Sequence, residues 1–167
     1  MKVDINNQSK EQINEHEIKA LVQFFAKTFE VYDREISIAI VEDDVMRRLN
    51  NDYRQKDTST DILSFDGDDD LFGELIVDYK QVKRQDHYFS EKVDEELLFI
   101  ITHGLVHLLG YEDELEEDRI VMINKGKEIL KKLIEILSLL MIFQKTTYKI
   151  PDSLLAQVKK LLPLQGI

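Results

Sequence analysis

Residues 103–113 read HGLVHLLGYED, and this stretch holds two of the chain's four histidines. On a helix, His103 and His107 lie one turn apart on the same face, where both imidazoles can bind one metal ion. Gly110 ends the helix and lets the chain turn back, so that Asp113 can return a carboxylate to the same ion. The spacing predicts three ligands at the C-terminal end of a long central helix, with a fourth position open, as in catalytic metal sites.

The residues beside this motif predict that its helix is largely buried. Leu97–Ile101 and Leu105-Val106 are apolar runs, and burying two imidazoles costs free energy unless each has a partner. Imidazole and carboxylate ligands suit one divalent metal, zinc in first place, with nickel, cobalt, manganese or iron as competitors. Gly104 stands where the His-Glu-x-x-His proteases carry their general base, which counts against a peptidase.

The composition narrows the class of protein. A chain of 167 residues, 43% of them hydrophobic, suits one domain with a real core, and the absence of cysteine excludes disulfide and thiolate chemistry. The net charge of −11 argues against a general nucleic-acid-binding surface, although a local RNA site stays open. No signal peptide or membrane-length apolar run is evident, so we expect a cytoplasmic protein with no membrane partner.

Hydrophobic periodicity predicts an α+β fold, a small mixed β-sheet of about four strands packed with five or more helices. The expected strands cover residues 3–5, 36–41, 62–65 and 73–78, of which the last two form a hairpin; the expected helices cover residues 15–30, 43–53 and 91–109, with one more from Tyr79 and one after Tyr111. Asp43 and Ser90 are the expected helix N-caps.

The chain is expected to have two parts. Residues 1–130 should form a single metallohydrolase-like domain. Residues 131–167, rich in bulky apolar side chains, should form a helical C-terminal extension that packs on the core or on a second subunit, with a last short helix capped by Asp152. The oligomeric state stays open.

Three segments resemble the motifs of one family. Residues 103–111 are close to His-Gly-x-x-His-Leu-x-Gly-Tyr-Asp-His, residues 51–65 (NDYRQKDTSTDILSF) to Asn-x-x-Tyr-Arg…Thr-Asp-Val-Leu-Ser-Phe, and residues 72–76 to a Gly-Asp-Ile strand. With these motifs in this order, roughly residues 35–130 resemble the YbeY family of bacterial endoribonucleases, which act in ribosomal RNA maturation. One departure is clear, because Asp113 stands where the family has its third histidine. A carboxylate there should weaken the metal as a Lewis acid and favour harder ions such as Mn²⁺, and Glu112 or Glu114 could replace it as the ligand.

The resemblance implies metal-dependent cleavage of single-stranded RNA in ribosomal RNA maturation and ribosome quality control, with the ribosome or its proteins as partners. Arg54 matches the family's functional arginine, so it is the expected catalytic and phosphate-binding residue beside His103 and His107, unless it pairs with Asp57 or Asp61. The other expected site residues are Lys56 and Ser64 for substrate binding, and Asp61 and Glu74 around the metal ligands, with Glu74 orienting a histidine.

Two alternatives remain open at this stage. The chain could be a non-catalytic ribosome-assembly factor that binds RNA and holds a structural metal, in which case His107→Ala should unfold it. It could also be a metal-dependent hydrolase of another substrate, such as a peptide or small ester.

Overall fold

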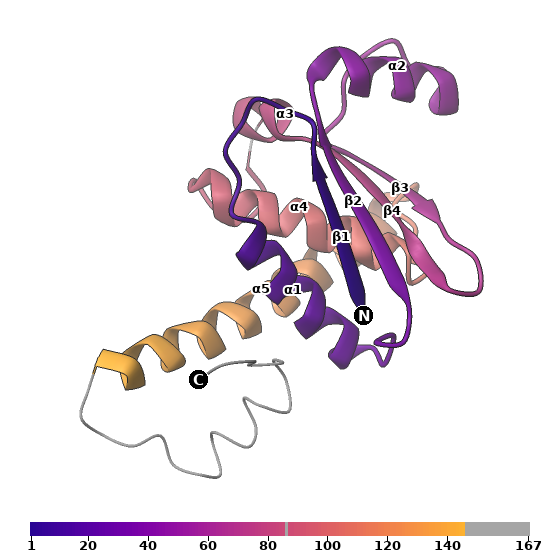
Figure 1. The fold of residues 1–167 in the computed structure, drawn as a ribbon. Coiled ribbons are helices and arrows are strands. Elements are labelled where there is room, and N and C mark those ends of the chain that lie inside the picture. The colour runs from indigo at the N-terminus through magenta and orange to yellow at the C-terminus, as the bar shows by residue number, and fades with distance from the viewer. Residues whose placement is uncertain (86, 146–167) are drawn as a thin grey trace.

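Four strands form one mixed β-sheet in the order β1-β2-β4-β3 (Figure 1). The computed structural model describes residues 1–85 and 87–145. Strands β1 (Lys2–Asn7), β2 (Glu35–Val41) and β4 (Leu71–Asp78) run parallel to one another, and β3 (Ile62–Asp66) pairs antiparallel with β4 at one edge. The predicted hairpin is therefore confirmed, and with it the mixed sheet.

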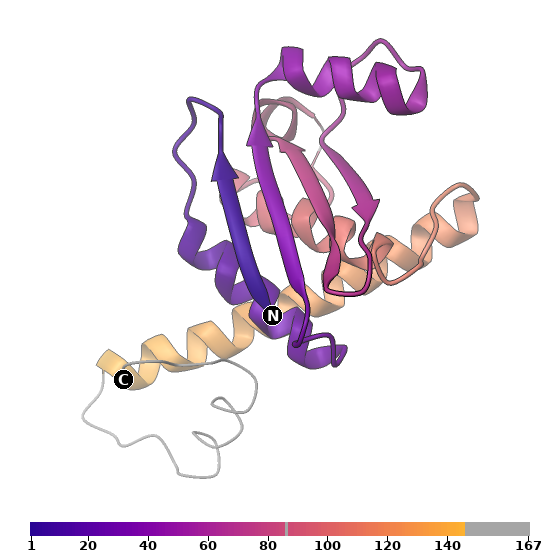
Figure 2. The same ribbon diagram turned by 45° about the vertical axis from the view of Figure 1, so that its right-hand side comes forward.

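Within the described residues the chain forms five helices, which confirms the predicted α+β class. They are α1 (Glu15–Thr28), α2 (Asp43–Arg54), α3 (Tyr79–Arg84), α4 (Val93–His107) and α5 (Glu116–Lys145). Helix α4 lies behind the sheet in Figure 2, and α5 runs back along it. No helix among the described residues is long and apolar enough to cross a membrane.

The main core lies between the sheet and helices α1, α4 and α5. Alternate residues of β2, namely Ile36, Ile38 and Ile40, are fully buried on this face, as the period of a strand requires. The opposite face carries a smaller apolar cluster, in which Val41 and Leu63 pack against Met46 of α2. This second cluster fixes α2, and so the position of Arg54 at its C-terminal end.

Both predicted N-caps are wrong. Helix α2 begins at Asp43 itself, whose carboxylate instead accepts a hydrogen bond from Arg84 Nη1 at 2.7 Å. Helix α4 begins at Val93, and the Ser90 hydroxyl donates to Glu95 at 2.8 Å. Ser90 is drawn away from the cap position because the buried carboxylate of Glu96 accepts the backbone N–H groups of residues 88–90.

Helix α5 runs through the predicted boundary at residue 130 as one helix, with Ile129, Leu130 and Leu133 buried in the main core. The division into a domain and a C-terminal extension stays a prediction. The expected helix after Asp152 lies outside the described residues.

Candidate metal centre and its cavity

The two motif histidines project from the last two turns of α4, which lies unusually close to the sheet. A Cβ on Gly104 would lie 2.6 Å from Cδ1 of Ile62 and 2.8 Å from Cδ2 of Leu75. A side chain at this position would therefore push α4 away from β3 and β4. The glycine that stands where a protease has its glutamate therefore has a packing role, because a larger residue would have to displace the side chains of Ile62 and Leu75.

A second close approach fixes the end of α4. A Cβ on Gly73 would lie 2.7 Å from the Phe65 carbonyl oxygen and 2.6 Å from Cδ2 of Leu108, the residue that follows α4. Gly110 then adopts a φ of 88°, which a residue without a side chain tolerates best. The chain turns back at this point and brings Asp113 to the histidines.

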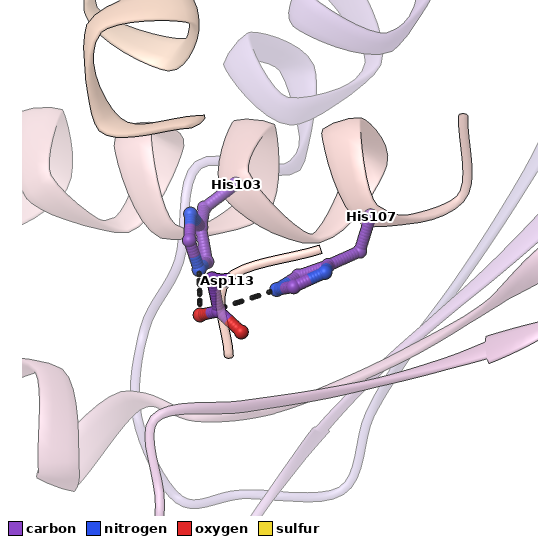
Figure 3. A group of neighbouring side chains, drawn as sticks. All are labelled: His103, His107 and Asp113. Carbon is purple, nitrogen blue, oxygen red and sulfur yellow. Dashed lines mark ion pairs between the residues drawn. The ribbon is translucent and has the colours of Figure 1, made fainter. Parts of the chain in front are cut away.

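His103, His107 and Asp113 converge as the spacing predicts (Figure 3). The Asp113 Oδ2 atom lies 3.6 Å from Nε2 of His103 and 3.6 Å from Nε2 of His107. The two imidazole rings are nearly perpendicular, with centroids 4.8 Å apart. Both histidine side chains are mostly buried, whereas Asp113 is 37% exposed.

The protonation states of the histidines suit metal binding. Nδ1 of His107 lies 3.0 Å from the Tyr111 carbonyl oxygen, which can only accept, so Nδ1 carries the proton and the Nε2 lone pair faces Asp113. Burial and the neighbouring His107 lower the pKa of His103, against the opposing effect of Asp113 and Asp61. The lowered pKa favours the neutral form of His103, which is the form that binds metals.

The donor set fits a small divalent ion. Ligand atoms at zinc distances of about 2.0–2.1 Å in tetrahedral geometry lie roughly 3.4 Å from one another, and the two nitrogen–oxygen distances here are 3.6 Å. The three ligand atoms all lie within 4.8 Å of one another, so modest side-chain movement would bring them onto one ion. The same three residues form the only group of three or more potential ligands in the described part of the chain.

A cavity of about 200 Å³ opens beside the cluster and gathers residues from several segments of the chain. Its polar lining includes Arg54 from the end of α2, Asp61 from the loop before β3 and Ser64 from β3 itself. Ser64 faces α4 because it shares a sheet face with Ile62, one pleat along the strand. The structure thus brings six predicted residues together, namely Arg54, Asp61, Ser64, His103, His107 and Asp113.

Arg54 makes no ion pair within the described residues. The two carboxylates considered as its partners, those of Asp57 and Asp61, contact other groups instead. Asp57 binds Arg47, whose Nε and Nη2 atoms each donate at 2.7 Å. Asp61 accepts from the backbone N–H of Ile62 at 2.9 Å and from Nε2 of Gln85 at 2.8 Å. The guanidinium of Arg54 is exposed on the cavity wall.

Two predicted residues do not line the cavity. Glu74 is exposed on the sheet face away from α4, because Gly73 and Leu75 on either side of it face the helix. It therefore does not lie beside a ligand histidine. Lys56 is exposed in the loop two residues beyond Arg54 and also lies outside the lining.

Several lining residues were not foreseen. Thr60, Tyr88 and Arg119 bring polar groups to the cavity, and Ile62, Phe99, Ile100 and Ile123 make it partly apolar. The helical spacing of Phe99, His103 and His107 could have pointed to Phe99. No local pattern indicates Tyr88 or Arg119, which reach the cavity from a loop and from the next helix.

Fold and site together are those of an α+β hydrolase-like domain with a candidate metal centre, and comparison with known proteins gives the family. A family profile described as Endoribonuclease YbeY matches residues 4–134. The chain belongs to the YbeY family of endoribonucleases, as its motifs suggested.

Relatives agree with this membership. "Endoribonuclease YbeY" of Finegoldia magna is 40% identical over 105 residues, which cover 59% of this chain and 69% of the relative. The protein of the same name from Carboxydothermus hydrogenoformans is 32% identical over 134 residues, covering 77% and 94%. A solution structure of a Thermotoga maritima protein is similar with a TM-score of 0.53 and 25% identity, covering 77% of this chain and 88% of its own.

Proposed function

We propose that this protein is a metal-dependent endoribonuclease that cleaves single-stranded RNA and acts in ribosomal RNA maturation and ribosome quality control. The observation that carries the proposal is the meeting of Arg54 with His103, His107 and Asp113 around one cavity. Arg54 comes from a different motif of the family, and these residues are distant in sequence. A purely structural metal would not need a neighbouring arginine that, among the residues the structure describes, makes no ion pair.

His103, His107 and Asp113 would hold the metal, with zinc as our first assignment. When bound, the ion would supply Lewis-acid chemistry that activates water or a phosphate oxygen. Burial lowers the pKa of His103 and the Tyr111 carbonyl orients His107, so the protein itself prepares the donor atoms. Asp61, held by Gln85 and by its own loop, adds a fixed negative charge near His103.

Arg54 would bind the phosphate of the RNA backbone. Its planar guanidinium can donate two parallel hydrogen bonds to a phosphate and stabilise the charge that develops during cleavage. Ser64 has its hydroxyl on the same wall and would hydrogen-bond the RNA. We retain Lys56 as a weaker, outer contact, since it lies near Arg54 in sequence but outside the lining.

The cavity favours single strands over duplexes. Its volume of about 200 Å³ lies below the usual range for small-molecule pockets, roughly 300–1,000 Å³. Only an unpaired nucleotide can leave its stack and enter so small a site. Ribosomal RNA and ribosomal proteins are the proposed partners, and they would compensate for the chain's net charge of −11, which otherwise repels RNA.

The direct test is cleavage of matched single-stranded and duplex RNA by the zinc-loaded protein. Arg54→Gln should lower kcat by about 10²- to 10³-fold, the usual loss for one donor to a developing charge, and His107→Ala should abolish cleavage. Both variants should keep the circular dichroism spectrum of the wild type. Arg48→Gln is the matched control, because Arg48 is an exposed arginine of the same helix that pairs with Asp44 and lies outside the cavity.

Other outcomes would favour the alternatives. RNA binding without cleavage would indicate an assembly factor, and unfolding of His107→Ala would indicate a structural metal. Cleavage of esters or peptides but not RNA would indicate another hydrolase. The role in maturation is tested separately, since depletion of the protein in its host should leave unprocessed ribosomal RNA ends.

A further inference from the structure

We propose that the cavity contains a nucleotide subsite next to the metal centre, in which Tyr88 stacks on one RNA base and Arg119 binds a backbone phosphate. The inference rests on the proposed function and goes beyond it by naming the residues that bind the RNA next to the cleavage site. Neither residue belongs to the family motifs quoted above. Both line the cavity that holds the histidines.

The cavity lining combines polar groups with apolar ones. Helices α4 and α5 pack against each other, and a Cβ on Gly126 would lie 3.1 Å from Cε2 of Phe99. Because α5 runs back along α4 (Figure 2), Ile123 and Arg119, which precede Gly126 on α5, lie successively farther from the level of Phe99 and toward the end of α4 that carries the histidines. A phosphate at the metal centre would therefore have an apolar space beside it.

Tyr88 lies in the cavity lining beside Phe99 and is available to stack. The residue is 49% exposed, and its ring lies against that of Phe99 with centroids 6.1 Å apart and an interplanar angle of 37°. Phe89, the next residue, stacks on the same Phe99 ring at 5.8 Å with an interplanar angle of 8°. An aromatic ring that rests against a second ring and is partly exposed to solvent is a usual platform for an unpaired base.

The loop that carries Tyr88 is held rigidly. The carboxylate of Glu96, fully buried in α4, accepts the backbone N–H groups of Tyr88 at 2.7 Å, Phe89 at 2.8 Å and Ser90 at 3.0 Å. Three charge-assisted hydrogen bonds to one buried group fix the loop before any ligand arrives. The order that a bound base needs is therefore already present.

Arg119 supplies the second positive charge of the cavity. Its only ion pair in the described residues is with Glu116 on the same helix, at 2.8 Å, and the two side chains are 52% and 68% exposed. Exposed pairs of this kind contribute little, so a phosphate can replace Glu116 at small cost. Arg54 and Arg119 then offset the negative charges of Asp61 and Asp113, and a divalent ion makes the lining net positive.

Two pairs of variants isolate the subsite. Tyr88→Leu is matched with Tyr32→Leu, which removes a tyrosine that is 52% exposed and outside the cavity. Arg119→Gln is matched with Lys132→Gln, which also removes an exposed cation paired within α5, here to Glu128 at 2.7 Å. Tyr88→Phe keeps the stacking ring and should retain wild-type behaviour.

Binding of a fluorescent single-stranded oligoribonucleotide to the zinc-loaded protein is measured by anisotropy, with cleavage kinetics on the same RNA. Tyr88→Leu should weaken binding about 5- to 10-fold, within the range for loss of one stacked base. An RNA that lacks the base next to the cleavage site should bind wild type equally weakly, and Tyr88→Leu should weaken it no further. Arg119→Gln should reduce the slope of log K against log salt by about 0.7, one single-strand phosphate contact.

The subsite is refuted if Tyr88→Leu and Arg119→Gln match their controls, or if Tyr88→Leu is equally harmful with and without the base. Either result with active wild-type protein would leave the endoribonuclease proposal standing. Wild-type protein that neither binds nor cleaves RNA would remove both proposals together.

Discussion

Asp113 gives the candidate metal centre a charge that the family's histidine would not. Two neutral imidazoles and one carboxylate leave a bound divalent ion with one positive charge instead of two. The ion should then be a weaker Lewis acid, and oxygen-preferring metals should compete better with zinc. The Asp113 Oδ2 atom lies 3.6 Å from Nε2 of both histidines, in the position that a third ligand would occupy.

Metal binding should depend on Asp113. We expect about one divalent ion per chain in the wild type by mass spectrometry, and at least tenfold weaker zinc binding by calorimetry in Asp113→Ala, because two ligands remain. Asp113→His should restore binding and raise the preference for zinc over Mn²⁺. Glu114→Ala is the control, and a loss of zinc there equal to that in Asp113→Ala would show that Glu114 is the ligand instead.

At the scale of elements, the position of α4 depends on a glycine between the two histidines. In Gly104→Ala the new methyl group would press on Ile62 and Leu75, both buried. Overpacking typically lowers the free energy of unfolding by about 1–3 kcal/mol. The higher helix propensity of alanine offsets roughly 1 kcal/mol of this loss. Urea unfolding should therefore show a net loss of up to about 2 kcal/mol, with weaker zinc binding as the helix moves outward.

Gly126→Ala is the matched control on α5. Its Cβ would lie 3.1 Å from a ring carbon of Phe99, so the neighbour needs to move only slightly. We expect a stability close to that of wild type. Equal losses in the two variants would mean that the close approach of α4 to the sheet is not what requires Gly104.

Helix α2, which carries Arg54, is tied to α3 by an ion pair whose strength depends on pH. Arg84 lowers the pKa of Asp43 far below its usual value, whereas burial and the nearby Asp43 raise the pKa of Asp78. A lowered carboxyl pKa contributes stability above the unfolded-state value of about 3.9, and this contribution is lost as the pH falls below it. Arg84→Gln should therefore reduce the free energy of unfolding at pH 7 but reduce it less at pH 3.

The corresponding measurement is urea unfolding of both proteins at the two pH values. Arg48→Gln serves as the control, since the Arg48–Asp44 pair is exposed and 3.6 Å apart. A destabilisation by Arg84→Gln that is as large at pH 3 as at pH 7 would show that the arginine acts through packing and not through the charge of Asp43.

For the molecule as a whole, the candidate metal centre lies at the margin of the core and not inside it. The main cluster lies between the sheet and α1, α4 and α5, whereas the ligand residues stand at the end of α4, where the chain turns at the surface. We expect chelation to leave the circular dichroism spectrum unchanged and to abolish cleavage. Added zinc should raise Tm by an amount that grows with the logarithm of its concentration. Unfolding on chelation would instead indicate a structural metal.

The fold class and half of the site were predictable because both depend on short-range geometry. Alternating β-branched residues mark β2, and four-residue spacing places His103 and His107 together on any helix. The break at Gly110 then leaves Asp113 near enough to return. Helix caps were predicted less well, because Glu96 holds residues 88–90 by hydrogen bonds that the local sequence does not reveal.

The amino-acid sequence by itself determined the family, the candidate metal ligands and the elements that carry them, since each depends on residues near one another in the chain. Only the tertiary structure decided what surrounds the metal centre. Strand β4 carries apolar residues on both faces, so its pattern did not show that Glu74 points away from α4. The return of α5 along α4 brings Arg119 to the cavity, and the fixed loop brings Tyr88. Contacts of this kind, between residues distant in sequence, depend on how the helices and strands pack. That packing is set by the shape of the whole core and not by spacing along the chain.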